Sequence, residues 1–211
     1  MNIVFDFGAV LFDWRPADRV AARFSGLVSN AEQAQSLAQS IFGHADWHAF
    51  DCGHLLLEQV VERTAVRLAL ARDQVQRLLA PIGEELRPIE DNVAMLHRLA
   101  QLREKNAGLR LFFLSNMPEP FARSIETGHG FLKLFDGGIF SGDVKLGKPD
   151  PAIYRLLGHR HGLRAEETWF VDDHPVNVQA ACALGWQGLH LRQPQHLPAL
   201  LRQALGQQLA L

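Results

Sequence analysis

The sequence predicts an α/β fold, a doubly wound parallel sheet with an inserted α-helical module. In the second half of the chain, short apolar runs typical of buried strands alternate with segments whose apolar residues recur at helical spacing. This alternation is typical of a parallel sheet with helices on both faces. Residues 15–88 break the alternation and contain no strand-like run, which predicts a helical insertion after the first strand.

The expected sheet is built from short runs rich in Val, Ile, Phe or Leu. They cover residues 3–7, 111–114, 138–140, 169–171 and 188–191. Helical spacing predicts core helices over 93–103 and 153–160. A third helix is expected from Pro175 to a C-cap at Gly185, because Pro suits the first turn of a helix and Gly its end.

The insertion is expected to hold three helices. Ser29 and Glu32 form a capping-box pattern that opens the first, which runs through Ile41. A long second helix is expected over 54–70 and a shorter one over 73–79. The resulting boundaries assign residues 1–14 and 89–211 to a core and residues 15–88 to the insertion.

Composition limits the classes of function and location. Of 211 residues, 47% are hydrophobic and 21% charged, which is typical of a globular protein, and the formal charge of −2 argues against nucleic acid as a partner. No apolar run reaches the ~18–20 residues of a membrane span, and the first residues lack the features of a signal peptide. The two cysteines are too few for a disulfide framework, which favours a reducing, cytoplasmic location.

Polar residues that do not fit a core role follow four of the expected strands. They are Asp6, Ser115–Asn116, Lys148 in the 145–151 loop, and Asp172–Asp173. In a doubly wound sheet, ligands bind beyond the carboxyl ends of the strands, so these groups are expected to converge. Three carboxylates repel one another unless a cation lies among them, and oxygen ligands favour Mg²⁺. A lysine and a hydroxyl beside them suit a phosphate group.

These motifs resemble those of the haloacid dehalogenase superfamily of hydrolases, in the branch with an inserted α-helical cap after the first strand. The resemblance rests on DFGAV, LFFLSN, GKPDPAIY and VDDHPVN, in the order and spacing of that family. It implies a Rossmann-like core over 1–14 and 89–211, a cap over 15–88, and a hydrolase acting on a small phosphorylated metabolite, plausibly a sugar phosphate. It leaves open whether the protein is a monomer or a homodimer.

The resemblance also implies roles for individual residues. Asp6 would be the nucleophile that forms an aspartyl-phosphate. Asp6, the Gly8 carbonyl, Asp172 and Asp173 would hold Mg²⁺, some of them through water. Ser115, Lys148, Asn116 and the backbone N–H groups at Gly8 and Ala9 would bind the phosphoryl oxygens, and Lys148 would also reduce the repulsion between nucleophile and phosphate. Trp14, Trp47 and Asp51 would contact the substrate or join cap to core.

Position 8 departs from the family pattern. Phosphatases of this superfamily usually carry Asp-x-Asp, whose second aspartate protonates the leaving oxygen and later activates water. Here that position is Gly8, as in a similar subgroup of bacterial sugar-phosphate phosphatases. Asp13, His174 or a cap residue could supply the acid, and slow turnover is expected because a general acid contributes ~10²–10⁴-fold.

Three alternatives remain at this point. A 2-haloacid dehalogenase would share Asp6, Ser115 and Lys148, but those enzymes use no metal and lack the acidic pair at Asp172–Asp173. A phosphomutase relies on the acid that is absent at position 8. A non-catalytic protein that binds metal and phosphate would also fit a chain that lost this acid. His44 and His48, four residues apart, are expected to have surface or cap roles rather than to bind metal.

Overall fold

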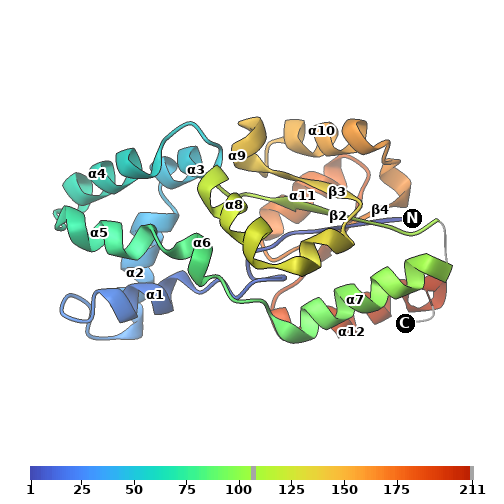
Figure 1. The fold of residues 1–211 in the computed structure, drawn as a ribbon, viewed down its shortest axis with the longest axis horizontal. Helices are drawn as coiled ribbons and strands as arrows, with labels where there is room; N and C mark the ends of the chain where they lie inside the picture. The colour runs from blue at the N-terminus through green and yellow to red at the C-terminus, as the bar shows by residue number, and fades with distance from the viewer. Residues whose placement is uncertain (106–107, 210–211) are drawn as a thin grey trace.

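The computed structural model describes residues 1–105 and 108–209. Its centre is a parallel five-stranded sheet in the order β3-β2-β1-β4-β5 (Figure 1). The strands are β1 (Asn2–Phe5), β2 (Arg110–Ser115), β3 (Gly137–Phe140), β4 (Thr168–Asp172) and β5 (Gln187–His190). Each strand overlaps the run predicted for it, and the predicted α/β class is confirmed. Residues 106–107 and 210–211 of the predicted core lie outside the described residues.

Helices cover both faces of the sheet. The helices are α7 (Glu90–Lys105) and α12 (Leu197–Leu209) on one face and α10 (Pro151–His161) and α11 (Pro175–Ala183) on the other. Successive β-strand residues point to opposite faces, so both layers can be followed in β1. Ile3 and Phe5 belong to the apolar cluster that includes α7 and α12, whereas Val4 packs in a second cluster with residues of α10 and α11.

The first helices of the chain lie together at one side of the sheet, on the left of Figure 1. They are α1 (Pro16–Arg23), α2 (Ala31–Phe42), α3 (Ala45–Asp51), α4 (Leu57–Leu68), α5 (Arg72–Leu79) and α6 (Ile82–Glu85). We call residues 16–85 the helical segment. It contacts the remainder of the chain through α6 against α8 (Glu119–Gly128) and α3 against α9 (Ser141–Val144). Close packing explains Gly83, because a Cβ there would lie 2.8 Å from the Cα of Phe121.

One predicted helix of this segment is wrong in its extent. The helix predicted over 54–70 is α4, which runs only from Leu57 to Leu68, and it is preceded by α3, which the sequence did not predict, and a turn. Gly53 has φ +68°, and the N–H groups of His54 and Leu55 both donate to the Ala49 carbonyl, which ends α3. The polar and aromatic residues of α3 hid a short helix that tertiary packing stabilises.

The ends of two further helices test the capping predictions. The cap of α2 is one residue later than predicted: Asn30 accepts from the Gln33 N–H, and the Gln33 side chain accepts from the N–H and hydroxyl of Ser29. Asn and Gln thus replace Ser and Glu in the same reciprocal pattern. The C-cap of α11 is Leu184, one residue before the predicted Gly185, and Gly185 follows it with φ +85°. The remaining short helices are 3₁₀ turns at Gly130–Leu134, Ala165–Glu167 and Pro194–His196.

Candidate active site

The parallel register brings the predicted polar residues to one edge of the sheet. Phe5 lies opposite Phe113 of β2 and Val171 of β4, so the three strands end within about two residues of the same level. Asp6 comes directly after β1, and its N–H donates to the Val171 carbonyl over 2.9 Å. This bond fixes the first residue beyond β1 against β4. Ser115 ends β2, and Asp172 ends β4, so the side chains that follow these strands face a shared space.

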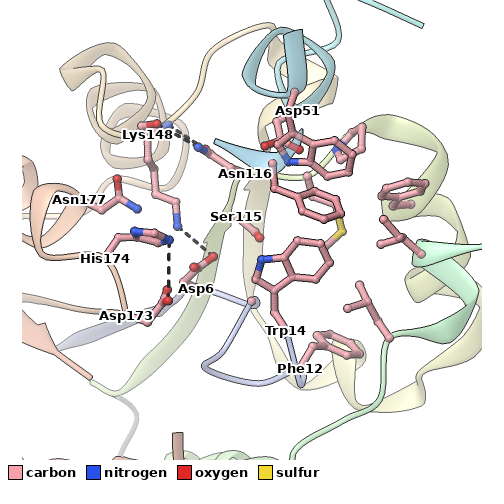
Figure 2. A pocket seen from close by; sticks show the side chains of 18 residues that line it. Asp6, Phe12, Trp14, Asp51, Ser115, Asn116, Lys148, Asp173, His174 and Asn177 are labelled. Carbon is pink, nitrogen blue, oxygen red and sulfur yellow. Dashed lines mark hydrogen bonds and ion pairs between the residues drawn. The ribbon is translucent and has the colours of Figure 1, made fainter. Parts of the chain in front are cut away.

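Lys148 joins two of the three carboxylates. Its Nζ lies 2.9 Å from Oδ1 of Asp6 and 2.6 Å from Oδ2 of Asp172, and its side chain is 1% exposed. Asn116 fixes the Lys148 backbone in both directions: it accepts from the N–H over 2.8 Å and donates to the carbonyl over 2.9 Å (Figure 2). The amide of Asn116 therefore positions the lysine, a role that the sequence did not indicate.

Asp172 is fully engaged by donors behind the pocket. Besides Lys148, its carboxylate accepts from the His174 N–H over 2.7 Å and from the Asn177 amide over 3.0 and 3.1 Å. Asn177 in turn is fixed by the Tyr154 hydroxyl, which donates to its carbonyl. These donors fix the orientation of the buried Asp172 carboxylate. Asp172 is thus suited to holding Lys148 in place.

The electrostatics of the cluster are strongly perturbed. Burial raises the pKa of Asp6 to about 7; Lys148 counteracts this effect, and Asp172 and Asp173 add to it. Burial also raises the pKa of Asp173. For Lys148, burial favours the neutral amine, but the carboxylates of Asp172 and Asp6 outweigh it, so its pKa lies above the usual value. The lysine therefore stays charged.

The donor set fits a magnesium ion. One carboxylate oxygen from each of Asp6, Asp172 and Asp173 lies within 4.8 Å of the others. These are hard oxygen ligands, which Mg²⁺ prefers, and Mg²⁺ commonly uses only one or two carboxylates and completes its shell with water and phosphate oxygens. Asp173 is the more accessible acid of the pair after β4, with a side chain that is 25% exposed.

A pocket opens over this cluster, and its two sides differ in chemistry (Figure 2). We call Asp6, Ser115, Lys148 and Asp173 the polar wall. The facing side, the aromatic wall, consists of Trp14, Phe42, Trp47 and Phe121. Its rings pack on one another, with centroids 5.2 Å apart for Trp14–Phe42 and 4.8 Å apart for Phe42–Trp47. Further apolar lining comes from Phe12, Ile82, Leu86 and Met117.

Most of the predicted site residues line this pocket. They are Asp6, Gly8, Trp14, Trp47, Asp51, Ser115, Asn116, Lys148 and Asp173. Asp172 lies behind Lys148 and is 0% exposed. Ala9 is not part of the lining, and its N–H donates to the Phe12 carbonyl over 2.8 Å. The two histidines considered for a metal do not pair: His44 caps α3, and His48 lies 3.7 Å from the Cys52 sulfur.

The turn after Asp6 contains a residue in the left-handed region of backbone conformation. The residue in the left-handed region is Ala9, with φ +52°, and not Gly8. A Cβ at Gly8 would make ordinary contacts with Trp14, at 3.7 Å from its Cβ. The absence of a side chain at Gly8 therefore leaves room beside Trp14 rather than relieving backbone strain.

Sequence reasoning missed Asn177 and part of the aromatic wall. Asn177 stands in the VDDHPVN stretch, five residues after Asp172 and in the first turn of a helix that begins at Pro175. That spacing returns its side chain to the strand end, which could have identified it. Phe42 ends α2, and Phe121 lies in α8. The two residues are 79 positions apart in the sequence. Nothing local in the sequence links them.

Comparisons with known proteins agree on one family. The model of the haloacid dehalogenase-like hydrolases matches residues 3–185. Sesquiterpene phosphatase astK of Aspergillus oryzae is 28% identical over 205 residues, which cover 96% of this chain and 95% of that protein. A haloacid dehalogenase family enzyme of Bacteroides thetaiotaomicron, solved with magnesium and inorganic phosphate, matches with 18% identity and a TM-score of 0.71, over 95% of this chain and 98% of that one. L-2-haloacid dehalogenase of Xanthobacter autotrophicus matches with 21% identity and a TM-score of 0.62, over 100% of this chain and 84% of that one.

Proposed function

Because the chain belongs to the haloacid dehalogenase-like hydrolases, we propose that it hydrolyses phosphomonoesters with Mg²⁺ in the pocket around Asp6. The observation that carries this proposal is the cluster of three carboxylates at the carboxyl edge of the sheet, two of which pair with one buried ammonium. Such a cluster suits a phosphoryl group bound together with a divalent ion. The similarity to a fungal phosphatase along nearly the whole chain supports it further.

In this reaction Asp6 attacks phosphorus, forms an aspartyl-phosphate and is released again when water attacks the same phosphorus. Lys148 keeps Asp6 in place through its 2.9 Å contact and offsets charge repulsion as the phosphate approaches. Ser115 and Lys148 bind phosphoryl oxygens, and Asn116 and Asp172 act through Lys148, whose backbone and ammonium they hold. Asp6, Asp173 and the Gly8 carbonyl would hold the metal, with Asp172 close by. When bound, Mg²⁺ would neutralise phosphate charge.

The substrate proposed here has an apolar body, because four aromatic side chains face the polar wall. A sugar phosphate would bring several hydroxyl groups against these rings and leave them without hydrogen-bond partners, which costs free energy. An alkyl, prenyl or aryl phosphate would instead bury apolar surface. The name of the Aspergillus oryzae relative, a sesquiterpene phosphatase, is in keeping with such a substrate. The sugar phosphate expected from the sequence is the less favoured alternative.

The helical segment has the role of a cap in this proposal. Trp47 and Phe42 come from its helices and close one side of the pocket, whereas Asp6 and Lys148 come from the core. The boundaries of 1–14 and 89–211 for the core and 15–88 for the cap are part of this proposal. None of the helices in the described part of the chain is long and apolar enough to cross a bilayer. The two free cysteines favour a reducing, cytoplasmic compartment.

A 2-haloacid dehalogenase is the second candidate, since L-2-haloacid dehalogenase shares the fold. The acidic pair disfavours it: Asp173 would add a negative charge beside a substrate that is itself a carboxylate. A protein that binds metal and phosphate without turnover is the third candidate. It is disfavoured because Lys148 and Asp6 keep the contact that nucleophilic attack requires.

Two substrates and one isosteric variant separate these candidates. Hydrolysis of p-nitrophenyl phosphate is measured with Mg²⁺ and with a chelator, and chloride release from 2-chloropropionate is measured in parallel. The proposal predicts metal-dependent phosphate release that Asp6→Asn lowers by roughly 10⁴-fold or more. Metal-independent chloride release would overturn the phosphatase proposal in favour of a 2-haloacid dehalogenase. Phosphate binding without either reaction would establish the binding protein.

The substrate class needs a separate comparison. Hexyl phosphate and glucose 6-phosphate are offered to the same enzyme, and kcat/KM is compared. The proposal expects hexyl phosphate to react at least about tenfold faster, which corresponds to the burial of about two CH₂ groups. A preference for the sugar phosphate would overturn the apolar assignment and leave the phosphatase itself intact.

A further inference from the structure

The proposed function leaves one chemical task unassigned, and the inference below rests on that function. When the bond between phosphorus and the leaving oxygen breaks, an alcohol leaves readily only if its oxygen receives a proton. The neighbour of Asp6 that usually supplies this proton is here Gly8, which carries no side chain. The donor must therefore come from another element that lines the pocket.

Two of the three candidates considered from the sequence are poorly placed. Asp13 is not part of the pocket lining, and its Oδ1 accepts from the Arg15 guanidinium over 2.7 Å. The Asp13 carboxyl is therefore held outside the pocket, away from the leaving oxygen. His174 does line the pocket, but its side chain is 69% exposed, and its Nε2 lies 3.8 Å from Asp173, on the side where the metal would bind.

Asp51 meets the requirements that these two residues fail. It is the last residue of α3, and it lines the pocket with Asp6 and Lys148. Figure 2 shows it beyond Ser115, on the far side of the labelled polar groups from Asp173. Among the described residues, no ion pair or hydrogen bond engages its carboxyl group. An unpaired carboxyl beside apolar rings favours its neutral, protonated form.

The charges around Asp51 act in the same direction. Burial raises the pKa of Asp51 well above its usual value, and the negative charge of Asp6 raises it further, whereas Lys148 opposes both effects. The raised pKa favours the protonated form of Asp51, which is the form that general-acid catalysis requires.

The main chain at Asp51 is anchored to the core. The Ser141 hydroxyl donates to the Asp51 carbonyl, and the same oxygen accepts the Met117 N–H over 2.7 Å. Ser141 begins α9 directly after β3, and Met117 follows β2 by two residues. The end of α3 is therefore fixed to the same strand ends that position Ser115 and Asn116, which gives the carboxyl a defined place relative to the phosphoryl site.

We propose that Asp51 is the general acid and base of this enzyme, donated by the helical segment in place of the residue absent at Gly8. As Asp6 bonds to phosphorus and the leaving oxygen departs, the Asp51 carboxyl gives that oxygen its proton and becomes a carboxylate. In the second step, the carboxylate takes a proton from water while the water oxygen attacks phosphorus. The bond between phosphorus and Asp6 then breaks, phosphate leaves, and both aspartates return to their starting states.

The test compares leaving groups in the first turnover of Asp51→Asn. Hexyl phosphate has a poor leaving group that needs a proton, whereas p-nitrophenyl phosphate releases a stable anion. We expect the variant to release hexanol ~10²–10⁴-fold more slowly than wild type, and nitrophenol within about tenfold of wild type. We also expect a burst of nitrophenol followed by slow turnover, because the second step lacks its base. The nitrophenol burst doubles as evidence that the variant is folded.

Two results would overturn the assignment of Asp51. One is hexanol release at the wild-type rate; the other is an equal loss for both substrates, as expected for a residue with only a structural role. Asp46→Asn, on the same helix but paired with Arg63 outside the pocket, is the matched control and should behave as wild type. A wild-type enzyme that hydrolyses neither phosphate ester would instead refute the proposed function.

Discussion

The two walls of the pocket are built in different ways. The polar wall comes from residues that end β2, directly follow β1 and β4, or lie in the loop before α10, so the carboxyl edge of the sheet and Asn116 position them. The aromatic wall combines Trp14, two residues of the helical segment and Phe121 of α8. In the proposed function this contrast separates two tasks: the sheet edge would supply the phosphoryl chemistry, and the packing of the helical segment on the core would select the group that carries the phosphate. Substitutions in the two walls should therefore have different signatures.

Lys148→Met should have the largest effect. It leaves Asp6 and Asp172 buried without their ammonium, which costs about 3–5 kcal/mol of unfolding free energy. It also removes a charge at the phosphoryl site, lowering kcat by roughly 10²–10³-fold. Thermal unfolding and steady-state kinetics measure the two effects. Lys145→Met, in the same loop but exposed, should change neither, and an unaltered melting temperature for Lys148→Met would contradict the described ion pairs.

Asp173→Asn should weaken the binding of Mg²⁺ more than it lowers kcat at saturating Mg²⁺. The variant loses a charged oxygen from the cluster, so the Mg²⁺ concentration for half-maximal activity should rise about 10–100-fold. Asp172→Asn is the informative partner variant. Because Asp172 holds Lys148, its loss should lower kcat even at saturating Mg²⁺. Identical metal titrations for Asp173→Asn and wild type would remove Asp173 from the metal site.

Trp14→Ala should weaken only the contacts that the aromatic wall makes with the apolar part of the substrate. Its ring packs on Phe42 and Trp47, and its loss should raise KM for hexyl phosphate by about tenfold, the value of part of a buried side chain. The KM for methyl phosphate, which cannot reach the aromatic wall, should stay within about twofold. Leu27→Ala, exposed and distant from the lining, is the control. A similar rise for both substrates would mean that Trp14 positions the polar wall instead.

Alkylation of the two cysteines should have the smallest effect on activity. Burial raises the pKa of Cys52 to about 11, and the charges of Asp51 and Asp150 add to the shift, whereas Cys182 is exposed. Because the thiolate is the reactive form, iodoacetamide at pH 8 should modify Cys182 and leave Cys52 more than about a hundredfold slower. The rate at which iodoacetamide modifies Cys52 should rise about tenfold per pH unit up to pH 10. Mass spectrometry of the modified peptides measures this, and activity should be unchanged while only Cys182 reacts.

The sequence predicted the polar wall much better than the aromatic wall. Asp6, Ser115 and Asp172–Asp173 each follow an apolar strand, and a parallel sheet brings such positions to one edge whatever its remaining details. The five strands could be recognised for the same reason, because strands buried on both faces have continuous apolar runs. Local pattern was therefore sufficient for this half of the site.

Where helices meet, the sequence was less informative. The division between α3 and α4 depends on Gly53 and on hydrogen bonds to the Ala49 carbonyl, neither of which alters the apolar spacing of the segment. Phe42 and Phe121 line the same pocket because each packs against Trp47 of α3. Asp51 was named as a cap residue, but its unpaired carboxyl and its raised pKa depend on burial that only the folded chain creates.

The hydrogen bond between Ser141 and the Asp51 carbonyl also constrains how the protein can admit a ligand. Gly53, just beyond it, lies so near the Gly142 carbonyl oxygen that a Cβ would be 2.7 Å away. A rigid-body rotation of the helical segment that preserved these contacts would have its hinge at the end of α3. Helices α4 and α5 would move furthest. Asp51 would hardly move, and it would already be in position when the helical segment closed over the pocket.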